Sequence, residues 1–161
     1  MDSFEDFKIK KQLKNAVKDL GITKPTPIQK ESYSPILAGA DFVGIAQTGT
    51  GKTFAYLLPI LQDLKFSDQP HPRVLILAPT RELVIQIVEE IEKLIQYISV
   101  RVTGVYGGSN NINRQKIAVS HGLDIIVGTP RRLYDLAISN VLRLKAIKKL
   151  VIDEVDIMLD F

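Results

Sequence analysis

The stretch from Ala46 to Thr53 has the residue types and the spacing of a phosphate-binding loop, with Ala46 in place of the usual first glycine. Its glycines let successive backbone N–H groups point toward one phosphate, and a helix beginning at its end adds a partial positive charge. Lys52 can then reach the outer phosphates, and the Thr53 hydroxyl can hold Mg²⁺. A chance glycine-rich turn is the alternative. The predicted nucleotide-binding residues are Ala46, Gln47, Thr48, Gly49, Thr50, Gly51, Lys52 and Thr53.

A second group of chemically useful residues, Asp153-Glu154-Val155-Asp156, follows an apolar run near the end of the chain. Nucleotide hydrolysis needs a metal, an oriented water and a cradle for phosphate. Asp153, at the tip of the run, is placed to hold Mg²⁺ through water, and Glu154 is the candidate base for the attacking water. The alternative is an exposed acidic turn that only ends a strand, and the upstream phosphate loop makes that alternative weaker.

Strands that alternate with helices are predicted to position both groups. Apolar runs predict strands over 42–45, 73–78, 100–106, 124–127 and 150–152. Helical spacing and helix-start residues predict helices over 9–20, 27–37, 52–64, 80–98 and 110–121, and a short one from 130 onward. This alternation is typical of an α/β fold whose mostly parallel sheet is covered on both faces. Ligands bind such sheets at the carboxyl ends of the strands, where the unusual stretches fall.

Composition sets limits on the class of protein. The chain has 161 residues, 45% of them apolar and 24% charged, which fits one soluble domain. Cysteine is absent, so thiol chemistry is excluded and the cytoplasm is the expected location. No apolar run approaches the ~20 residues of a membrane span, and the first residues do not resemble a signal peptide. The net charge of +3 is compatible with nucleic acid but too small to argue for it alone.

Several charged and polar residues are interpreted as structural. His71 and His121 have no metal-ligand partner at a useful spacing. A basic group near the end of the chain is expected to be a solvated face more readily than a nucleic-acid site: Arg143, Lys145, Lys148 and Lys149.

Six motifs, in order and in spacing, resemble the first RecA-like domain of DEAD-box RNA helicases. The segment from Gly21 to Gln29 resembles the family's Q motif, and Phe4 lies seventeen positions before Gly21, where the family has an aromatic residue. The other motifs are the phosphate loop, Pro79-Thr80-Arg81-Glu82-Leu83, Gly107-Gly108, Thr129-Pro130-x-Arg132 and Asp153-Glu154-x-Asp156. The resemblance covers residues 1–161, with the Q-motif region over 4–29, and implies a three-layer RecA-like P-loop domain.

This resemblance implies ATP and Mg²⁺ as cofactors and assigns roles to single residues. Gln29 would read the adenine edge, because an amide donates and accepts together, with Thr26 assisting and Phe4 packing behind. Lys52, Asp153 and Glu154 would be catalytic, and Thr53 and Asp153 would hold the metal. The residues implied to lie along the RNA backbone are Pro79, Thr80, Arg81, Gly108, Thr129 and Arg132.

Other readings of these RNA-binding positions are a helix cap for Thr80, a tight turn for Gly107-Gly108 and a helix start for Thr129-Pro130. Each of them is compatible with contact to RNA phosphates, which backbone N–H groups, hydroxyls and arginines bind without reading bases.

Three residues depart from the family's pattern. Ile22 stands where an aromatic residue usually lies beside adenine, so stacking there is expected to be weaker. Arg131 replaces a glycine, and either restricts the backbone or adds a phosphate contact. Val155 replaces an alanine, and no mechanism is attached to it.

We therefore predict the N-terminal part of an ATP-dependent RNA helicase core. Two alternatives remain: a module that binds adenine nucleotide or RNA without turnover, and a P-loop ATPase that acts on DNA. The Gln29 segment argues against the second, because it is the adenine-specific feature of the RNA helicases.

The resemblance also implies a strand between the phosphate-loop strand and the strand that ends at Asp153, and after it a second RecA-like domain as partner. Neither is encoded in these residues, so C-terminal strands are expected to be missing from the sheet. We expect a one-strand gap or a new pairing there, since parallel neighbours lie ~4.8 Å apart. We also expect little ATPase activity from the chain alone, and self-association through its exposed strand edges.

Overall fold

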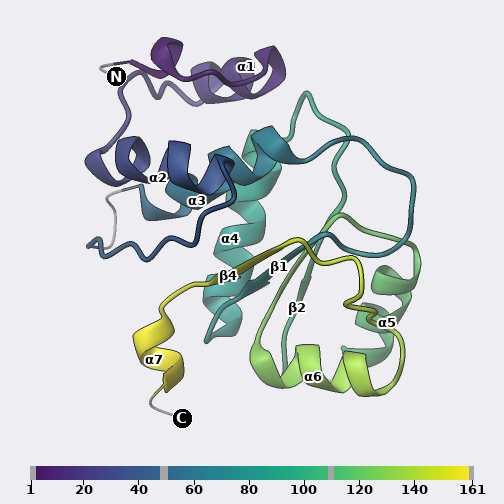
Figure 1. Ribbon diagram of the computed structural model, residues 1–161. Coiled ribbons are helices and arrows are strands. Elements are labelled where there is room, and N and C mark those ends of the chain that lie inside the picture. The colour runs from purple at the N-terminus through teal and green to yellow at the C-terminus, as the bar shows by residue number, and fades with distance from the viewer. Residues whose placement is uncertain (1–2, 48–50, 109–110, 160–161) are drawn as a thin grey trace. The chain divides into compact units, whose positions relative to one another are not determined.

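Residues 3–47, 51–108 and 111–159 are described by a computed structural model of the chain (Figure 1). They divide into two units. The first contains the residues up to Phe66 together with Glu90–Ser99, and the second contains Ser67–Glu89 and the residues from Val100 onward. The phosphate-loop residues Lys52 and Thr53 belong to the first unit, and the acidic residues that follow Ile152 belong to the second.

The first unit is built from helices. A short 3₁₀ helix, Phe4–Asp6, precedes α1 (Lys11–Asp19), α2 (Pro27–Leu37) and α3 (Lys52–Asp63). Helices α2 and α3 pack side by side (Figure 1). The buried hydroxyl of Ser32 on α2 donates a 2.8 Å hydrogen bond to the carbonyl oxygen of Ala55 on α3. This packing brings the start of α3 next to the segment that begins α2.

The strand predicted over residues 42–45 is wrong. Residues 40–47 form no helix or strand, and Val43 and Ile45 are 86% and 95% exposed. A strand needs a neighbour to pair its backbone N–H and C=O groups, and this segment pairs with none of the strands that the structure describes. Among the described strands no new pairing with this segment occurs, and the expected one-strand gap stays a prediction.

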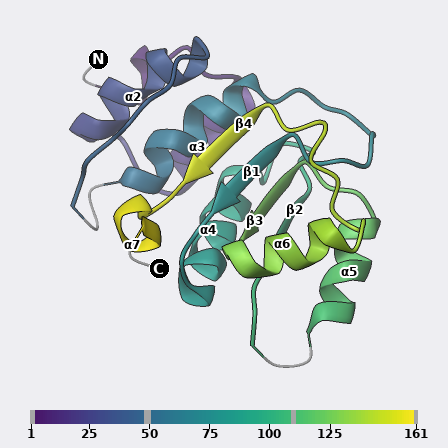
Figure 2. The same cartoon turned by 60° about the horizontal axis from the view of Figure 1, so that its bottom comes forward.

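The second unit holds a parallel sheet of four strands: β1 (Val74–Leu77), β2 (Val102–Val105), β3 (Ile125–Gly128) and β4 (Lys149–Ile152). Their order is β2-β3-β1-β4, so β2 and β4 are the edges (Figure 2). In the register, Val74 lies opposite both Ile125 and Lys149. The α/β class and the parallel sheet are confirmed, and each strand lies within a predicted apolar run or differs from it by one residue.

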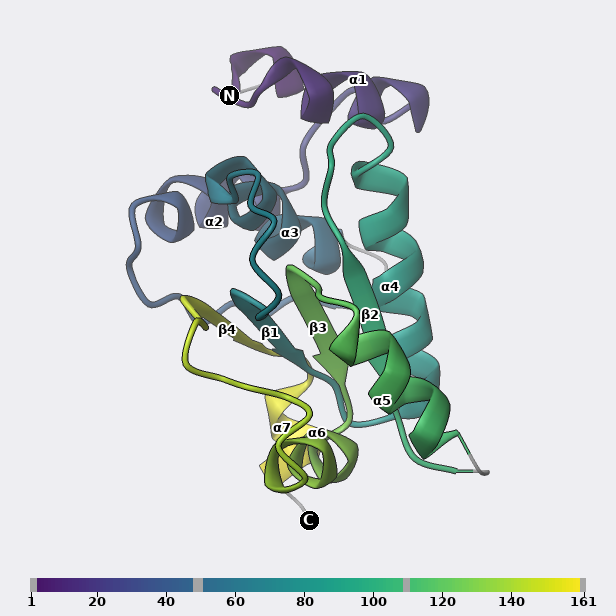
Figure 3. The ribbon, with the colours of Figure 1, turned by 90° about the vertical axis from the view of Figure 1, so that its right-hand side faces the viewer.

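Helices cover both faces of this sheet. Helices α5 (Ile112–Ser120) and α6 (Pro130–Ile138) pack on the face that carries Ile126, while Gly104 faces the other way because successive strand residues alternate. Val84 and Val88 of α4 (Arg81–Leu94) lie so close to Gly104 that an added Cβ would meet them at 3.2 and 2.9 Å. Figure 3 shows the sheet from the side, with α5 and α6 near its lower end. The second unit is therefore three-layered. One core cluster consists of Val105, Val119, Leu123, Ile126, Leu133, Leu136 and Leu142.

A buried carboxylate joins the amino ends of three strands. Asp124, directly before β3, accepts hydrogen bonds from Arg73 Nη2 at 2.9 Å, from the backbone N–H of Arg101 at 2.8 Å and from Arg101 Nη2 at 3.1 Å. Burial alone would raise the pKa of Asp124, but the hydrogen bonds from Arg101 and Arg73 outweigh burial and lower the pKa from its ordinary value of 3.8. The opposite, carboxyl ends of the strands are left for the functional residues.

Candidate nucleotide and nucleic-acid site

The buried side chain of Gln29 connects two segments of the first unit. Its Oε1 accepts a 3.0 Å hydrogen bond from the backbone N–H of Thr26, and its Nε2 donates a 3.1 Å hydrogen bond to the carbonyl oxygen of Gly51. A carboxamide has two hydrogens and two acceptor lone pairs, so these bonds leave capacity for an adenine edge. The predicted adenine-reading residue thus also holds the last glycine of the phosphate loop.

Thr26 belongs to the same segment and caps α2. Its side chain forms a capping box with Gln29, in which Thr26 Oγ1 faces the backbone N–H of Gln29 and Gln29 Oε1 accepts from the backbone N–H of Thr26. Because Thr26 Oγ1 belongs to the same segment as Gln29, the polar groups present there fit a nucleotide base.

Gly51 needs to be glycine for two reasons. Its φ is +78°, in the left-handed region, and a Cβ at this position would overlap Nε2 of Gln29. Lys52 and Thr53 follow in the first turn of α3, where a helix attracts anions. Ala46 and Gln47 lie in the irregular segment before the loop. The predicted site residues Thr48, Gly49 and Thr50 lie outside the described residues.

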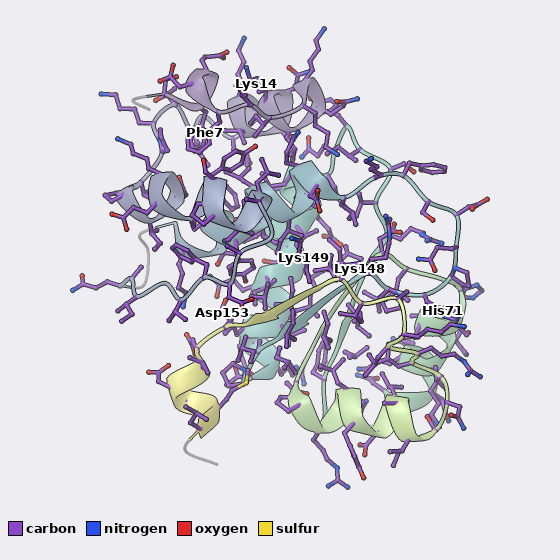
Figure 4. All side chains as sticks on the ribbon, in the orientation of Figure 1. Phe7, Lys14, His71, Lys148, Lys149 and Asp153 are labelled. Carbon is purple, nitrogen blue, oxygen red and sulfur yellow. The ribbon has the colours of Figure 1, made fainter. Side chains whose placement is uncertain are left out.

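Three aromatic rings in contact with one another connect the 3₁₀ helix to α2. Phe4 and Phe7 have ring centroids 5.3 Å apart, and Phe7 meets Tyr33 of α2 edge-on at 4.8 Å (Figure 4 labels Phe7). The backbone N–H of Phe4 also donates to the carbonyl oxygen of Thr23 at 3.4 Å. Burial raises the pKa of Tyr33 to about 12. Phe4 therefore reaches α2 through Phe7 and Tyr33, two residues that sequence analysis did not identify although Phe7 is only three positions further on.

The acidic residues follow β4 in the second unit. Asp153 is buried, and its backbone N–H donates a 2.9 Å hydrogen bond to the carbonyl oxygen of Leu77, which prolongs the pairing with β1 (Figure 4). Glu154 has a φ of +52°, which is uncommon outside glycine and gathers at functional sites. A short helix that the sequence did not predict, α7 (Val155–Leu159), begins directly afterwards.

The residues predicted to hold Mg²⁺ offer few protein ligands. Described residues include no group of three or more His, Cys, Asp or Glu side chains that could enclose a metal ion. Magnesium is commonly held by one or two protein oxygens, with waters and substrate phosphates as its other ligands. The hydroxyl of Thr53 and the carboxylate of Asp153 are oxygen donors of that kind.

The segments predicted to meet RNA lie at the carboxyl ends of the strands of the second unit. Thr80 caps α4, since its Oγ1 accepts a 3.2 Å hydrogen bond from the backbone N–H of Leu83. Gly108 is exposed with a φ of +86°. Helix α6 begins at Pro130, and the backbone N–H of Thr129 donates to the carbonyl oxygen of Val105 at 3.1 Å. The helix cap and the helix start are thus confirmed, and Pro79 directly precedes the first of them.

Arg132 is placed differently from an ordinary surface arginine. It is only 8% exposed, and its Nη1 donates a 2.8 Å hydrogen bond to Oε1 of Gln115 on α5. No carboxylate among the described residues forms an ion pair with it. Sequence analysis did not single out Gln115, although its position four residues before Val119 puts it on the buried face of its helix.

Comparison with known proteins decides the family. The model of the family described as DEAD/DEAH box helicase matches residues 26–161. The chain belongs to the DEAD/DEAH box helicase family.

Relatives of this DEAD/DEAH box helicase domain resemble it over nearly its full length. It is 43% identical to the Homo sapiens protein named Probable ATP-dependent RNA helicase DDX43, over 98% of this chain and 25% of the relative. It is 43% identical to DEAD-box ATP-dependent RNA helicase 30 of Arabidopsis thaliana, over 99% of this chain and 28% of the relative. It is 40% identical to ATP-dependent RNA helicase RhlB of Pseudomonas putida, over 98% of this chain and 41% of the relative. The chain spans less than half the length of these three relatives.

Arg131, which departs from the family's pattern, is exposed in this DEAD/DEAH box helicase domain. It pairs with Asp135 one turn later on α6, with 3.2 Å between Nε and Oδ1. Lys148 and Lys149 lie at the end of β4 away from Asp153 (Figure 4). Lys148 is exposed and Lys149 is half-buried, so the solvated basic face stays a prediction. None of the described helices is both long and apolar enough to cross a membrane.

Proposed function

We propose that this chain binds adenine nucleotide and RNA, and that it hydrolyses ATP as part of an ATP-dependent RNA helicase. The observation that carries this proposal is the Gln29 amide, which forms hydrogen bonds both to the backbone of Thr26 in the Q-motif segment and to the carbonyl oxygen of Gly51. Such an arrangement makes base recognition and phosphate binding parts of one site. The family and the names of the relatives support ATP as the nucleotide.

Roles for the reacting groups follow from their chemistry. Lys52 would neutralise the outer phosphates, and the N-terminus of α3 would add its partial charge. Thr53 and Asp153 would hold Mg²⁺, which supplies positive charge to the phosphates when bound. Glu154, held in its unusual backbone conformation, would accept a proton from the attacking water.

RNA would bind across the carboxyl ends of the strands in the second unit. Exposed Thr80, Arg81 and Gly108, together with the start of α6, offer hydroxyls, a guanidinium and backbone N–H groups. Groups of these kinds contact phosphate and sugar without reading the bases. A surface of this composition supports binding that follows the backbone and has little sequence preference.

Partners are also part of the proposal. A second RecA-like domain would complete the catalytic site, and the exposed side chains of Leu150 and Ile152 on the edge strand β4 would favour self-association of the chain alone. The chain alone is expected to bind nucleotide without appreciable turnover, because the second domain would supply the arginines that stabilise the transferring phosphate. The cytoplasm remains the expected location, because the sequence contains no cysteine.

Titration with fluorescent ADP and fluorescent GDP tests the proposal directly. We expect ADP to bind more tightly, and we expect Gln29→Ala to weaken adenine nucleotide binding by ~1–3 kcal/mol, the cost of a lost hydrogen bond in a closed site. The exposed Gln96 provides a matched control, since Gln96→Ala shortens the same side chain without touching the site. Equal affinities for ADP and GDP would overturn the assignment of an adenine-specific site.

A further inference from the structure

The side chain of Gln115 forms a three-way junction in the second unit. Its Nε2 donates a 3.1 Å hydrogen bond to the carbonyl oxygen of Tyr106, while its Oε1 accepts from the backbone N–H of Tyr106 at 3.3 Å and from Nη1 of Arg132 at 2.8 Å. The amide thus pairs with one peptide unit as a neighbouring strand would, and holds an arginine at the same time. All three residues lie beside segments assigned above to RNA.

Tyr106 extends this junction to α4. The guanidinium carbon of Arg81 lies 5.2 Å from the centroid of the Tyr106 ring, within the range of a cation–π contact. Tyr106 also directly precedes the Gly107-Gly108 turn. One buried amide therefore connects the three RNA-facing segments that follow β1, β2 and β3.

Arg132 is held in the junction by a neutral partner. Arg132 is buried without a carboxylate partner among the described residues, and a buried charge is normally paired. Gln115 binds the guanidinium through a neutral oxygen, so it fixes the position of Arg132 while leaving its positive charge uncompensated. A carboxylate at this position would hold the arginine equally well, but it would cancel that charge.

We propose that Gln115 is a positioning residue for RNA binding: it fixes Arg132 and the turn after Tyr106 at a set spacing, and keeps the charge of Arg132 available for a phosphate. This inference rests on the proposed RNA-binding function. Gln115 itself touches no RNA and acts through Arg132 and the peptide unit of Tyr106.

The test is Gln115→Glu in the natural gene product that carries this sequence, with a single-stranded oligouridylate as the probe. The variant keeps the size of the side chain and the acceptor that faces Arg132 and neutralises Arg132, and it also removes the Nε2 donation to the carbonyl oxygen of Tyr106, a loss that Gln115→Met shares. We expect RNA affinity to fall about tenfold, and the slope of log affinity against log salt to shrink by about 0.7, the value of one single-strand phosphate contact. Adenine nucleotide affinity should stay unchanged. The control is Gln86→Glu, the same change at an exposed position on α4, across the sheet from α5.

Two further measurements keep the proposal open to refutation if the glutamate variant folds poorly. Gln115→Met introduces an uncharged side chain of similar size. This variant should raise the RNA dissociation constant, while its circular dichroism spectrum should equal that of the parent and so show that it is folded. In an Arg132→Gln background, Gln115→Glu should have no additional effect on the salt slope. A folded Gln115→Glu protein with parental affinity and slope, or additive effects of the two changes, would overturn the proposal. Failure of the parent protein to bind RNA would instead refute the proposed function.

Discussion

Nε2 of Gln29 and the carbonyl oxygen of Gly51 lie 3.1 Å apart and are hydrogen-bonded, although 22 residues separate them in the chain. This bond makes the position of the phosphate loop depend on the side chain that is expected to read adenine. A nucleotide base that binds to Gln29 and shifts its side chain would therefore also shift Gly51, the last glycine before Lys52. Both residues lie in the first unit, so the relationship does not depend on any other part of the chain.

The substitution Gly51→Ala should remove nucleotide binding. The added Cβ overlaps Gln29 Nε2, and the left-handed φ costs about 1–2 kcal/mol for a residue with a side chain. Gly39→Ala is the matched control, because Gly39 has a φ of +85° but has no atom within 4 Å of the added Cβ. Fluorescent ADP titration should show a loss of binding only for Gly51→Ala. Equal losses in the two variants would mean that backbone strain, and not the contact with Gln29, explains the effect.

Glu154→Gln should leave nucleotide binding nearly intact and stop hydrolysis in the natural gene product that carries this sequence. Lys52→Ala should instead weaken nucleotide binding itself, because Lys52 contacts phosphates in the ground state whereas Glu154 acts on the water. Phosphate release with and without RNA, measured beside a nucleotide titration, separates the two effects. Near-normal turnover of Glu154→Gln would show that the assigned base is wrong.

Arg131→Gly should weaken RNA binding and reduce the magnitude of the salt slope by about one phosphate contact, or about 0.7 for single-stranded RNA. The exposed position of Arg131 beside the start of α6 motivates this expectation, although its pairing with Asp135 competes with a phosphate. Arg143→Gly is the control, because Arg143 belongs to the basic group interpreted as a solvated face. If the salt slope of Arg131→Gly equals that of the parent, Arg131 has no role in RNA binding.

Asp124→Ala should lower the free energy of unfolding by ~3–5 kcal/mol, because it leaves two arginines without their shared buried partner. Urea denaturation measures this change, with the exposed Asp41→Ala as control. The effect should also depend on pH. The folded-state pKa of Asp124 lies below its ordinary 3.8, so its contribution is complete above that value and is lost as the pH falls through the lowered pKa. A variant whose stability matches the parent near pH 6 would contradict this account.

The sequence predicted the elements of the second unit well because their signals are local. Val74–Leu77 and Ile125–Gly128 are continuous apolar runs, a pattern typical of parallel strands that are buried on both faces. The strand over 42–45 failed for the opposite reason. Its residues have the right character, but strand structure depends on a neighbour that no local pattern reveals.

The candidate site was predictable where a motif names a residue and unpredictable where tertiary contacts decide its environment. Lys52 was found from the spacing of the phosphate loop, and Gln29 from the resemblance of its segment to the family's Q motif. The burial of Arg132 depends on Gln115, which comes from a different helix, and no pattern in the sequence joins the two. In the same way, the route from Phe4 to α2 through Phe7 and Tyr33 needed the folded rings to be seen.

The strand order β2-β3-β1-β4 has a consequence for how the chain is made. Among the strands that the structure describes, β1 and β2 are not neighbours, so neither can pair until β3 has been synthesised. Arg73, just before β1, must wait for Asp124, 51 residues later. At a synthesis rate of about 5–20 residues per second, that interval lasts about 3–10 s. Helices α2 and α3, which are close in sequence, can pack long before then, so a ribosome-bound chain would hold a formed helical pair beside two unpaired apolar strands.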